Sequence, residues 1–347
     1  MPFVLPRPSG TVALKIRAIA WRAVRKVVIL QLYDKKNITP MRALLVTLLA
    51  LWAVGAPAQT FGARWVAAPH ADSTAAVWFR RTFVGTRRPL RGSVMVATHG
   101  QFRLYFNGAH LSPSAAHSPV PASHGGAATV TINVTPYLRA DSNTVALLYA
   151  PPRMGADSLQ QVAVCYYGRE RSGRPFAHQA DDSWLCRQAA VWLTPGGEYH
   201  DTPAEPDDGY GPQPALAAWV HPRATRQEDC PSGSRPSGLP VSLRPGAILR
   251  PRYFDIVSDT VSYEFGTGFY GYVRLTLRGA TRGQHLWVDG NEFVCTGQTD
   301  EQHYALFTPA YYRRVRVSGD AHFRPSQVQR VEGIALKPGA PSVYDNL

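Results

Sequence analysis

The chain has 347 residues, with 37 Lys and Arg against 24 Asp and Glu, and its formal net charge is +13. Residues 1–58 hold nine of the basic residues and one acid, so they carry eight of the thirteen net charges. The remaining charge is spread over residues 59–347 without a basic block. Nucleic-acid-binding proteins present a clustered basic face, so the composition argues against nucleic acid as a partner.

Residues 41–58 contain the three parts of a secretion signal. Met41 and Arg42 give a start and a positive charge, residues 43–54 form a run that is apolar apart from Thr47, and Ala56-Pro57-Ala58 is a small-residue cleavage site. The run is shorter than the ~18 residues that a spanning helix needs, so the alternative of a stable membrane anchor is less favoured. We predict cleavage after Ala58 and a secreted or periplasmic product.

Residues 1–40 precede this complete signal, and they are most simply an upstream extension produced by a start codon assigned too early. Their stretch "KIRAIAWRAVRKVVILQ" is rich in arginine and almost without acid. An amphipathic targeting or membrane-surface helix is therefore the competing interpretation. The helix interpretation is less favoured because it leaves the signal at Met41 unexplained.

All four cysteines lie in the part of the chain that the signal would export: Cys165, Cys186, Cys230 and Cys295. An oxidising compartment permits two disulfides with three possible pairings, and free half-buried thiols are an equal alternative. No Cys-x-x-Cys or His-Glu-x-x-His spacing is present, so we predict no metal site from a motif.

From Val77 onward, apolar residues recur with the period of two that is typical of strands. The strand candidates of residues 59–230 are "VWFRRTF", "RGSVMVATHG", "QFRLYFNGAHL", "ATVTINVT", "NTVALLYAP" and "QVAVCYYGRE". Asn107-Gly108 supplies the residue pair of a type I′ hairpin turn. Short strands with regular turns and no long amphipathic helix predict a β-sandwich.

Residues 231–251 are rich in proline and glycine and lack sustained periodicity, which predicts a linker. Strands resume in residues 252–347 as "TVSYEFG", "GYVRLTLRG", "QHLWVDG", "YALFTP" and "RRVRVSG". They predict a second, smaller sandwich. The expected fold is all-β, with two tandem antiparallel β-sandwiches of the jelly-roll or galactose-binding-like type.

Several stretches of residues 59–230 resemble the N-terminal β-sandwich of bacterial α-L-rhamnosidases of glycoside hydrolase family 78. That family has an R-x-x-F strand, an aromatic-x-L-x-x-N-G hairpin, a V-T-x-x-L-x-x-x-x-N turn, a D-x-S-W segment and a G-E-x-Y-D segment. Similar residues fall at 80–83, 102–108, 134–143, 182–184 and 197–201. The last segment departs from the pattern by placing His200 before Asp201. The sugar-binding sandwich of other exported glycosidases is a related resemblance.

The stretch "YEFGTGFYGYVRLTLRGATRGQHLWVDGNEF", followed by "HYALFTPAYYRRVRVSG", is similar to the next sandwich of the same enzymes. Their pattern is D-F-G-x-x-x-x-G, a strand ending in R-G, a later glutamate, and an F-x-P-x-Y/F-x-R-x-V strand. This chain has Glu264 in place of the aspartate, and Glu292 is the candidate for the later glutamate. Together the two resemblances cover roughly residues 62–335.

In the resembled enzymes, catalysis is performed by a following (α/α)6 domain that holds a pair of acids. Inverting hydrolysis needs a general acid and a general base about 6.5–9.5 Å apart. The sequence stops where that domain would be expected to begin, so no catalytic residue is carried over from the family. The expectation is a truncated or split-gene product.

The acids of this chain do not suggest a replacement for that pair. Adjacent acids occur at Asp181-Asp182, Asp207-Asp208, Glu228-Asp229 and Asp300-Glu301. Because adjacent strand residues point to opposite faces, these are predicted to be solvated loop acids and turn caps. Glu198, Glu264 and Glu292 lie among apolar strand residues and are predicted to make buried structural hydrogen bonds.

Six tryptophans could stack on sugar rings: Trp65, Trp78, Trp184, Trp192, Trp219 and Trp287. In a strand-rich chain, core packing is the favoured role for each. The resemblance also implies calcium, because some modules of the family bind rhamnose through it. No calcium ligands can be assigned here and no EF-hand loop is present, so the carbohydrate-binding residues stay unknown.

The first hypothesis is an exported, non-catalytic accessory or carbohydrate-binding region of an α-L-rhamnosidase-like glycoside hydrolase. Its partners would be a rhamnose-containing glycan or a catalytic (α/α)6 domain encoded separately. One alternative is an enzyme whose catalytic half is encoded downstream. The other is a stand-alone lectin-like module that binds rhamnose-containing glycans.

Overall fold

The computed structural model describes residues 64–69, 72–111, 128–151, 160–205, 209–210, 218–225 and 243–338. All of them belong to the compact unit Gly62–Leu347, and the other unit of the chain is Met1–Phe61. The predicted extension 1–40, the predicted signal 41–58 with its cleavage at Ala58, and Cys230 lie outside the described residues. These stay predictions.

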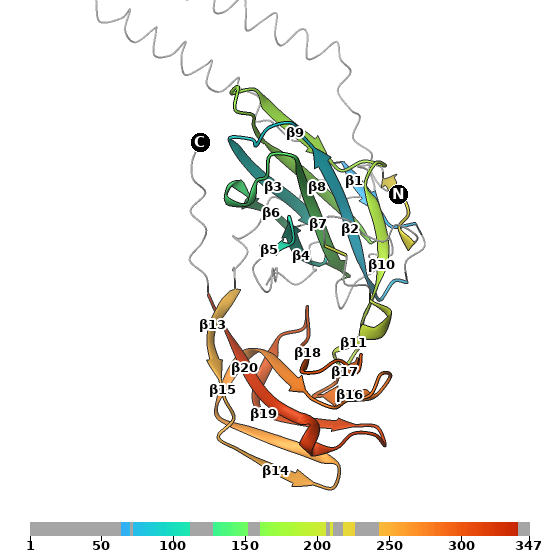
Figure 1. Cartoon of the computed structure of the whole chain (residues 1–347), viewed down its shortest axis with the longest axis vertical. Helices are drawn as coiled ribbons and strands as arrows, with labels where there is room; N and C mark the ends of the chain where they lie inside the picture. The colour runs from blue at the N-terminus through green and yellow to red at the C-terminus, as the bar shows by residue number, and fades with distance from the viewer. Residues whose placement is uncertain are drawn as a thin grey trace, which may run out of the picture. The chain divides into compact units, whose positions relative to one another are not determined.

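The first region is built from strands alone, apart from short 3-10 turns (Figure 1). Its strands are β1 (Trp65–Ala67), β2 (Ala75–Val84), β3 (Arg91–Thr98), β4 (Gln101–Phe106), β5 (Ala109–His110), β6 (Ala128–Asn133), β7 (Ser142–Ala150), β8 (Gln161–Arg169), β9 (Pro175–Gln179), β10 (Leu185–Leu193), β11 (Glu198–Asp201) and β12 (Arg223–Thr225). The 3-10 turns are η2 (Thr135–Tyr137) and η3 (Thr202–Ala204).

Two sheets of this region pack face to face. One has the order β12-β1-β8-β3-β6, with β9 beside β8, and the other includes β10-β2-β7-β4-β5. Phe79, Leu104 and Leu147 of the second sheet share one buried core with Val94 and Val164 of the first. β2, β3, β4, β7 and β8 contribute alternate residues to this core, which is the pattern of a β-sandwich.

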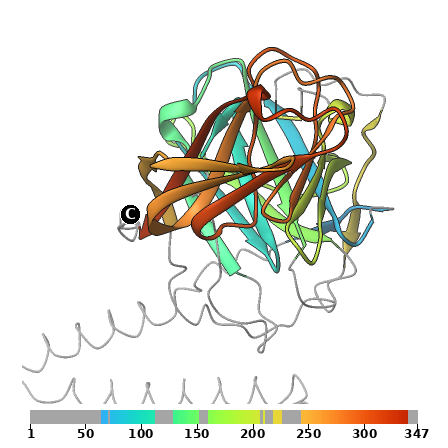
Figure 2. The same ribbon diagram turned by 90° about the horizontal axis from the view of Figure 1, so that it is seen from below.

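The second region is labelled in Figure 1 and is drawn in orange to red in Figure 2. It contains β13 (Leu243–Leu249), β14 (Tyr253–Val257), β15 (Thr260–Leu277), β16 (His285–Val288), β17 (Asn291–Val294), β18 (Glu301–His303), β19 (Ala310–Gly319), η6 (Pro325–Gln327) and β20 (Val328–Pro338). β15 is the longest strand and pairs with β14, β18, β19 and β20. A register shift between Glu264 and Phe269, with Gly266 at φ 74°, interrupts its pairing with β19. Leu275, Val315 and Val331 belong to the buried core of this region.

The large sheet continues from the first region into the second. Its order is β13-β20-β15-β19-β16-β17-β11-β10-β2-β7-β4-β5, and β11 pairs with β17 in parallel. All other pairings of the described strands are antiparallel. The described chain is thus all-β, as predicted, and the domain boundaries 59–230 and 252–347 stay a prediction.

The predicted hairpin turn is confirmed, and the predicted linker is wrong for residues 243–249. Asn107 and Gly108 both have positive φ, 53° and 86°, as the predicted hairpin turn between β4 and β5 requires. Residues 243–249 of the predicted linker form β13 on β20, with a register shift between Pro245 and Ala247 where proline cannot donate to the ladder. Residues 231–242 lie outside the described part of the chain.

The strand predicted for "YALFTP" is wrong. Only β18, which ends at His303, is a strand here, and residues 304–309 form a loop. The physical reason is that the backbone amides of Leu306, Phe307 and Thr308 donate to the carboxylate of Glu198 instead of to a neighbouring strand. No helix among the described residues has the length and hydropathy to cross a membrane.

Candidate functional site

A continuous line of side chains crosses four strands of the large sheet on one face. Trp192 on β10 opposes Tyr199 on β11, Tyr199 opposes Glu292 on β17, and Glu292 opposes Trp287 on β16. Directly opposed residues point to the same face of a sheet. We refer to these four residues as the aromatic row. Three strand spacings of about 4.8 Å make it about 14 Å long.

The alternate residues of the same strands fix which way the row faces. Val191, His200, Phe293 and Leu286 oppose one another across β10, β11, β17 and β16, and all four are buried. Because side chains alternate along a strand, burial of this set turns the aromatic row to the other face. Trp287 is 36% exposed there, and the side chain of Glu292 is 32% exposed.

The three rings of the row take part in two ring pairs. The Trp192 and Tyr199 ring centroids are 5.4 Å apart. The His285 ring, two residues before Trp287 on the same face, is stacked on the Trp287 ring at 6.1 Å with 28° between the planes. Two apolar ring platforms therefore flank the carboxylate of Glu292.

Polar groups lie between these platforms. His285 Nδ1 and Glu292 Oε1 are 2.7 Å apart, which orients the carboxylate, and Glu292 Oε2 has no hydrogen bond within the described part of the chain. Burial raises the pKa of the Tyr199 hydroxyl, and the charges of Asp201 and Glu292 raise it further. Tyr199 therefore keeps its proton at neutral pH and can donate, while the carboxylates can accept.

The row is supported from below by Glu198, which is fully buried. Its carboxylate accepts hydrogen bonds from the amides of Leu306, Phe307 and Thr308 at 2.7–2.8 Å and pairs with His200 Nε2 at 2.8 Å. Burial alone would raise the pKa of Glu198, but the bonds from His200 and these amides outweigh it and leave the pKa lowered. The predicted structural role of Glu198 is confirmed.

The other two predicted structural glutamates have different surroundings. Glu264 is 8% exposed and lies between the exposed Arg313 and Arg314, with Oε–Nε distances of 3.2 and 3.3 Å. Its carboxylate accepts hydrogen bonds from both arginines, so the predicted buried hydrogen bonds are confirmed and are also ion pairs. Glu292 is only half-buried and belongs to the aromatic row, so its predicted burial is wrong.

The tryptophans divide into two groups. Trp65, Trp78, Trp184 and Trp219 are at most 8% exposed, which confirms core packing for these four. Trp219 also lies under two guanidinium groups, those of Arg80 and Arg187, at 5.6 and 5.2 Å from the ring centroid. Of the six predicted tryptophans, Trp192 and Trp287 reach the surface, and both belong to the aromatic row.

The adjacent acidic pairs mostly behave as predicted. Asp181 accepts from the Ser183 amide at 3.0 Å in a turn, and Asp300 forms two hydrogen bonds of 2.7 Å with Arg278 at the surface. Asp207-Asp208 and Glu228-Asp229 lie outside the described residues. The expectation is wrong for Glu301, which is only 8% exposed, because its carboxylate accepts two hydrogen bonds from Thr296.

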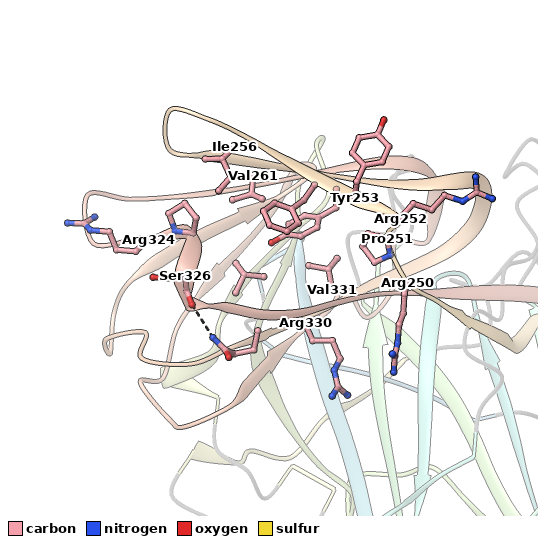
Figure 3. A pocket seen from close by; sticks show the side chains of 15 residues that line it. Arg250, Pro251, Arg252, Tyr253, Ile256, Val261, Arg324, Ser326, Arg330 and Val331 are labelled. Atoms are coloured by element: carbon pink, nitrogen blue, oxygen red, sulfur yellow. Dashed lines mark hydrogen bonds between the residues drawn. The ribbon is translucent and has the colours of Figure 1, made fainter.

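A pocket of about 920 Å³ lies elsewhere, between the hairpin β14–β15 and β20 (Figure 3). Its lining combines Tyr253, Phe254 and Ile256 with four arginines and contains no carboxylate. In Figure 3 the side chains of Arg250 and Arg330 extend away from the pocket interior. Its acceptors are neutral groups such as those of Ser326 and Gln329. The aromatic row instead combines ring platforms with a carboxylate acceptor, so the row is the stronger candidate.

The sequence pattern indicates Trp192, Trp287 and Glu292 separately, but it does not indicate Tyr199, His285 or the assembly of these residues on one face. A local signal was present, because "EYHD" and "HLWV" each alternate polar or aromatic residues with residues that are buried in the structure. The alternation does not reveal that β11 pairs in parallel with β17, which is the pairing that places the two segments side by side.

Comparison with protein-family models gives no match, and comparison with curated protein sequences gives no significant match. Solved structures do match. The α-L-rhamnosidase from Dictyoglumus thermophilum aligns over 81% of this chain with a TM-score of 0.70 and 16% identity. The fold is shared with α-L-rhamnosidases. The predicted resemblance is thereby confirmed for the fold.

Two further rhamnosidases also have a similar fold. The Streptomyces avermitilis enzyme, solved with L-rhamnose, aligns over 77% of this chain with a TM-score of 0.66 and 17% identity. The Aspergillus terreus enzyme aligns over 80% with a TM-score of 0.65 and 16% identity. The aligned part is 36%, 29% and 36% of the Dictyoglumus, Streptomyces and Aspergillus chains, so this chain spans about a third of their length.

Proposed function

We propose that this chain is a carbohydrate-binding accessory region of an α-L-rhamnosidase-like glycoside hydrolase, and that the aromatic row is its glycan-binding face. The observation that carries the proposal is the alignment of Trp192, Tyr199, Glu292 and Trp287 on one accessible face. The shared fold with rhamnosidases supports a rhamnose-containing glycan as the ligand class.

The chemistry of the row suits a sugar. The negative face of an aromatic ring attracts the slightly positive C–H groups on the apolar side of a pyranose. Rhamnose is a deoxy sugar, and its methyl group adds apolar surface that tryptophan can cover. Hydroxyls at the ring edge would bond to the carboxylates and to the Tyr199 hydroxyl, a combination of apolar platform and few polar groups that is typical of ligand sites.

We further propose that the region works beside a catalytic (α/α)6 domain and contributes no catalysis itself. The support is that the chain spans about a third of the rhamnosidases it resembles. Export is part of the same proposal and rests on residues 41–58. The N-terminus of the secreted protein is expected to begin with Gln59, and a mature product that retains Met41 would contradict cleavage after Ala58.

Binding is tested by titrating the full chain with rhamnose and with a rhamnose-containing polysaccharide while following tryptophan fluorescence and heat. Trp287→Ala is expected to weaken binding by about tenfold or more, which corresponds to about 1.4 kcal/mol. Tyr253→Ala is the control, because Tyr253 is 59% exposed but lies on β14, outside the row.

Two outcomes contradict the proposed site. One is saturable binding by the wild type that Trp287→Ala and Trp192→Ala leave unchanged. The other is an equal loss in Tyr253→Ala, which would indicate a general surface effect. If the folded wild type binds neither sugar nor polysaccharide, the proposed ligand class is wrong.

A further inference from the structure

Three buried side chains of different chemistry meet at the edge of the second core. The Cys295 Sγ, a carboxylate oxygen of Glu301 and a ring nitrogen of His303 all lie within 4.8 Å of one another. Their exposed fractions are 0%, 8% and 4%. Cys295 directly follows β17, while Glu301 and His303 are the first and last residues of β18 and point to the same face of that strand.

Two polar atoms in this cluster have no hydrogen-bond partner. They are Glu301 Oε1 and His303 Nε2, both buried. The nearest approach between the two side chains, Nε2 to Oε2, is 3.6 Å, which is longer than a hydrogen bond. Oε2 is already occupied by the amide and hydroxyl of Thr296 at 2.7 Å each. Buried polar atoms are normally satisfied, so this pair needs an explanation.

A divalent cation would satisfy both atoms and balance the charge. Cysteine binds metals as a thiolate, so Cys295 and Glu301 together would present two negative charges, and a neutral His303 would add none. A cation of charge +2 makes the buried group neutral overall, which avoids leaving an unpaired charge in the core. The proton of Cys295 leaves to solvent when the metal binds.

The donor set selects the metal. Sulfur, imidazole nitrogen and carboxylate oxygen are the ligands of zinc, whereas calcium takes six to eight oxygens. Glu301 Oε1 is the oxygen that remains for the metal, and a water molecule would complete the four ligands that zinc prefers. Supporting contacts are in place, because Thr296 holds the carboxylate and the Phe293 ring lies 5.3 Å from the His303 ring.

We propose that Cys295, Glu301 and His303 form a buried zinc site that joins β18 to the end of β17. β18 has three residues, and its last, His303, leads directly into the loop that donates to Glu198. A metal there would fix the start of that loop and, through Glu198, the underside of the aromatic row. The inference does not depend on whether the row binds glycans.

The test uses the full chain, expressed without a histidine tag, stripped with a chelator and then incubated with equimolar zinc. After desalting, about one zinc per chain is expected to remain, with a higher melting temperature than the stripped protein. With cobalt in place of zinc, an absorption band from thiolate-to-cobalt charge transfer is expected, because Cys295 would be a direct ligand. Zinc absent after incubation, with an unchanged melting temperature, would overturn the proposal.

Matched variants locate the site. Cys295→Ser and His303→Gln are expected to lose the bound zinc, and Cys295→Ser also the cobalt band. Cys165→Ser is the control, because Cys165 is equally a buried free thiol but lies on β8 outside the cluster. Zinc lost equally from Cys165→Ser would contradict the assignment. If Cys295→Ser does not fold, the cobalt spectrum of the wild type decides, and a spectrum without the thiolate band refutes the site.

Discussion

Tyr199 on β11 and Glu292 on β17 are opposed residues in a parallel strand pairing, which is the point where the large sheet passes from the first region to the second. Neither segment alone carries the aromatic row. Trp192 and Tyr199 come from the hairpin β10–β11, and Trp287 and Glu292 come from the hairpin β16–β17. The candidate binding face therefore exists only when the two hairpins are held together, and the buried groups beneath them determine its geometry.

Glu198 is the first group whose removal should separate the hairpins β10–β11 and β16–β17. Glu198→Ala leaves the buried amides of Phe307 and Thr308 and the His200 ring without their acceptor. The expected loss is about 3–5 kcal/mol in the free energy of unfolding, because a buried charge is deleted while its partners stay buried. Urea unfolding followed by circular dichroism measures it. Glu170→Ala, at an exposed position, serves as the control and should change stability by less than about 0.5 kcal/mol.

Glu198 also predicts a pH dependence. Its pKa is lowered in the folded protein, since the hydrogen bonds from His200 and the amides of Leu306 and Phe307 outweigh burial. A carboxyl with a lowered folded-state pKa contributes stability that is fully present above the unfolded value of about 4.3 and is lost as the pH falls through the folded value. The stability difference between wild type and Glu198→Gln should therefore shrink below about pH 4.3. A difference that stays constant down to the acid transition would contradict this role.

The sequence predicted the strands well because a half-buried strand requires alternation, and alternation is local. Phe102, Leu104 and Phe106 alternate as expected, and the turn at Asn107-Gly108 follows from the two positive φ angles that it needs. Residues 304–307 are a continuous apolar run, which is also compatible with a strand. They form a loop because the distant carboxylate of Glu198 accepts hydrogen bonds from the amides of Leu306, Phe307 and Thr308. The local pattern does not show whether these backbone amides will bond to a neighbouring strand or to Glu198.

The candidate sites were harder to predict for the same reason. Exposure of Trp287 and burial of Trp184 are not distinguished by their neighbours in the sequence, since both occur in strand-like or turn-like segments. The zinc-ligand candidates have the spacing Cys-x5-Glu-x-His, which is no common motif, and Glu301 was expected to be solvated beside Asp300. Only the return of β18 onto β15 buries it.

A substitution at Gly197 should change the junction without removing any charge. A Cβ at this position would lie 2.5 Å from Asn291 Oδ1 and 2.7 Å from the Gly290 carbonyl oxygen, so β11 would have to move away from β17. Gly197→Ala is expected to lower the free energy of unfolding by about 1–3 kcal/mol. Gly85→Ala is the control, because its nearest contact would be an ordinary 3.6 Å. Equal stability of Gly197→Ala and wild type would show that β11 and β17 are not closely constrained.

Hydrolysis is expected to be absent from the full chain. Glycoside hydrolysis needs a general acid and a base or nucleophile on either side of the bond. Two of the buried carboxylates are instead held by partners, Glu198 by amides and His200, and Glu332 by Arg274 at 2.6 Å. Incubation with an aryl α-L-rhamnoside should release no more aryl alcohol than a heat-treated sample. If release occurs, Glu292→Gln distinguishes the possibilities: loss of activity would make the aromatic row an active site, and retained activity would place catalysis elsewhere in the chain.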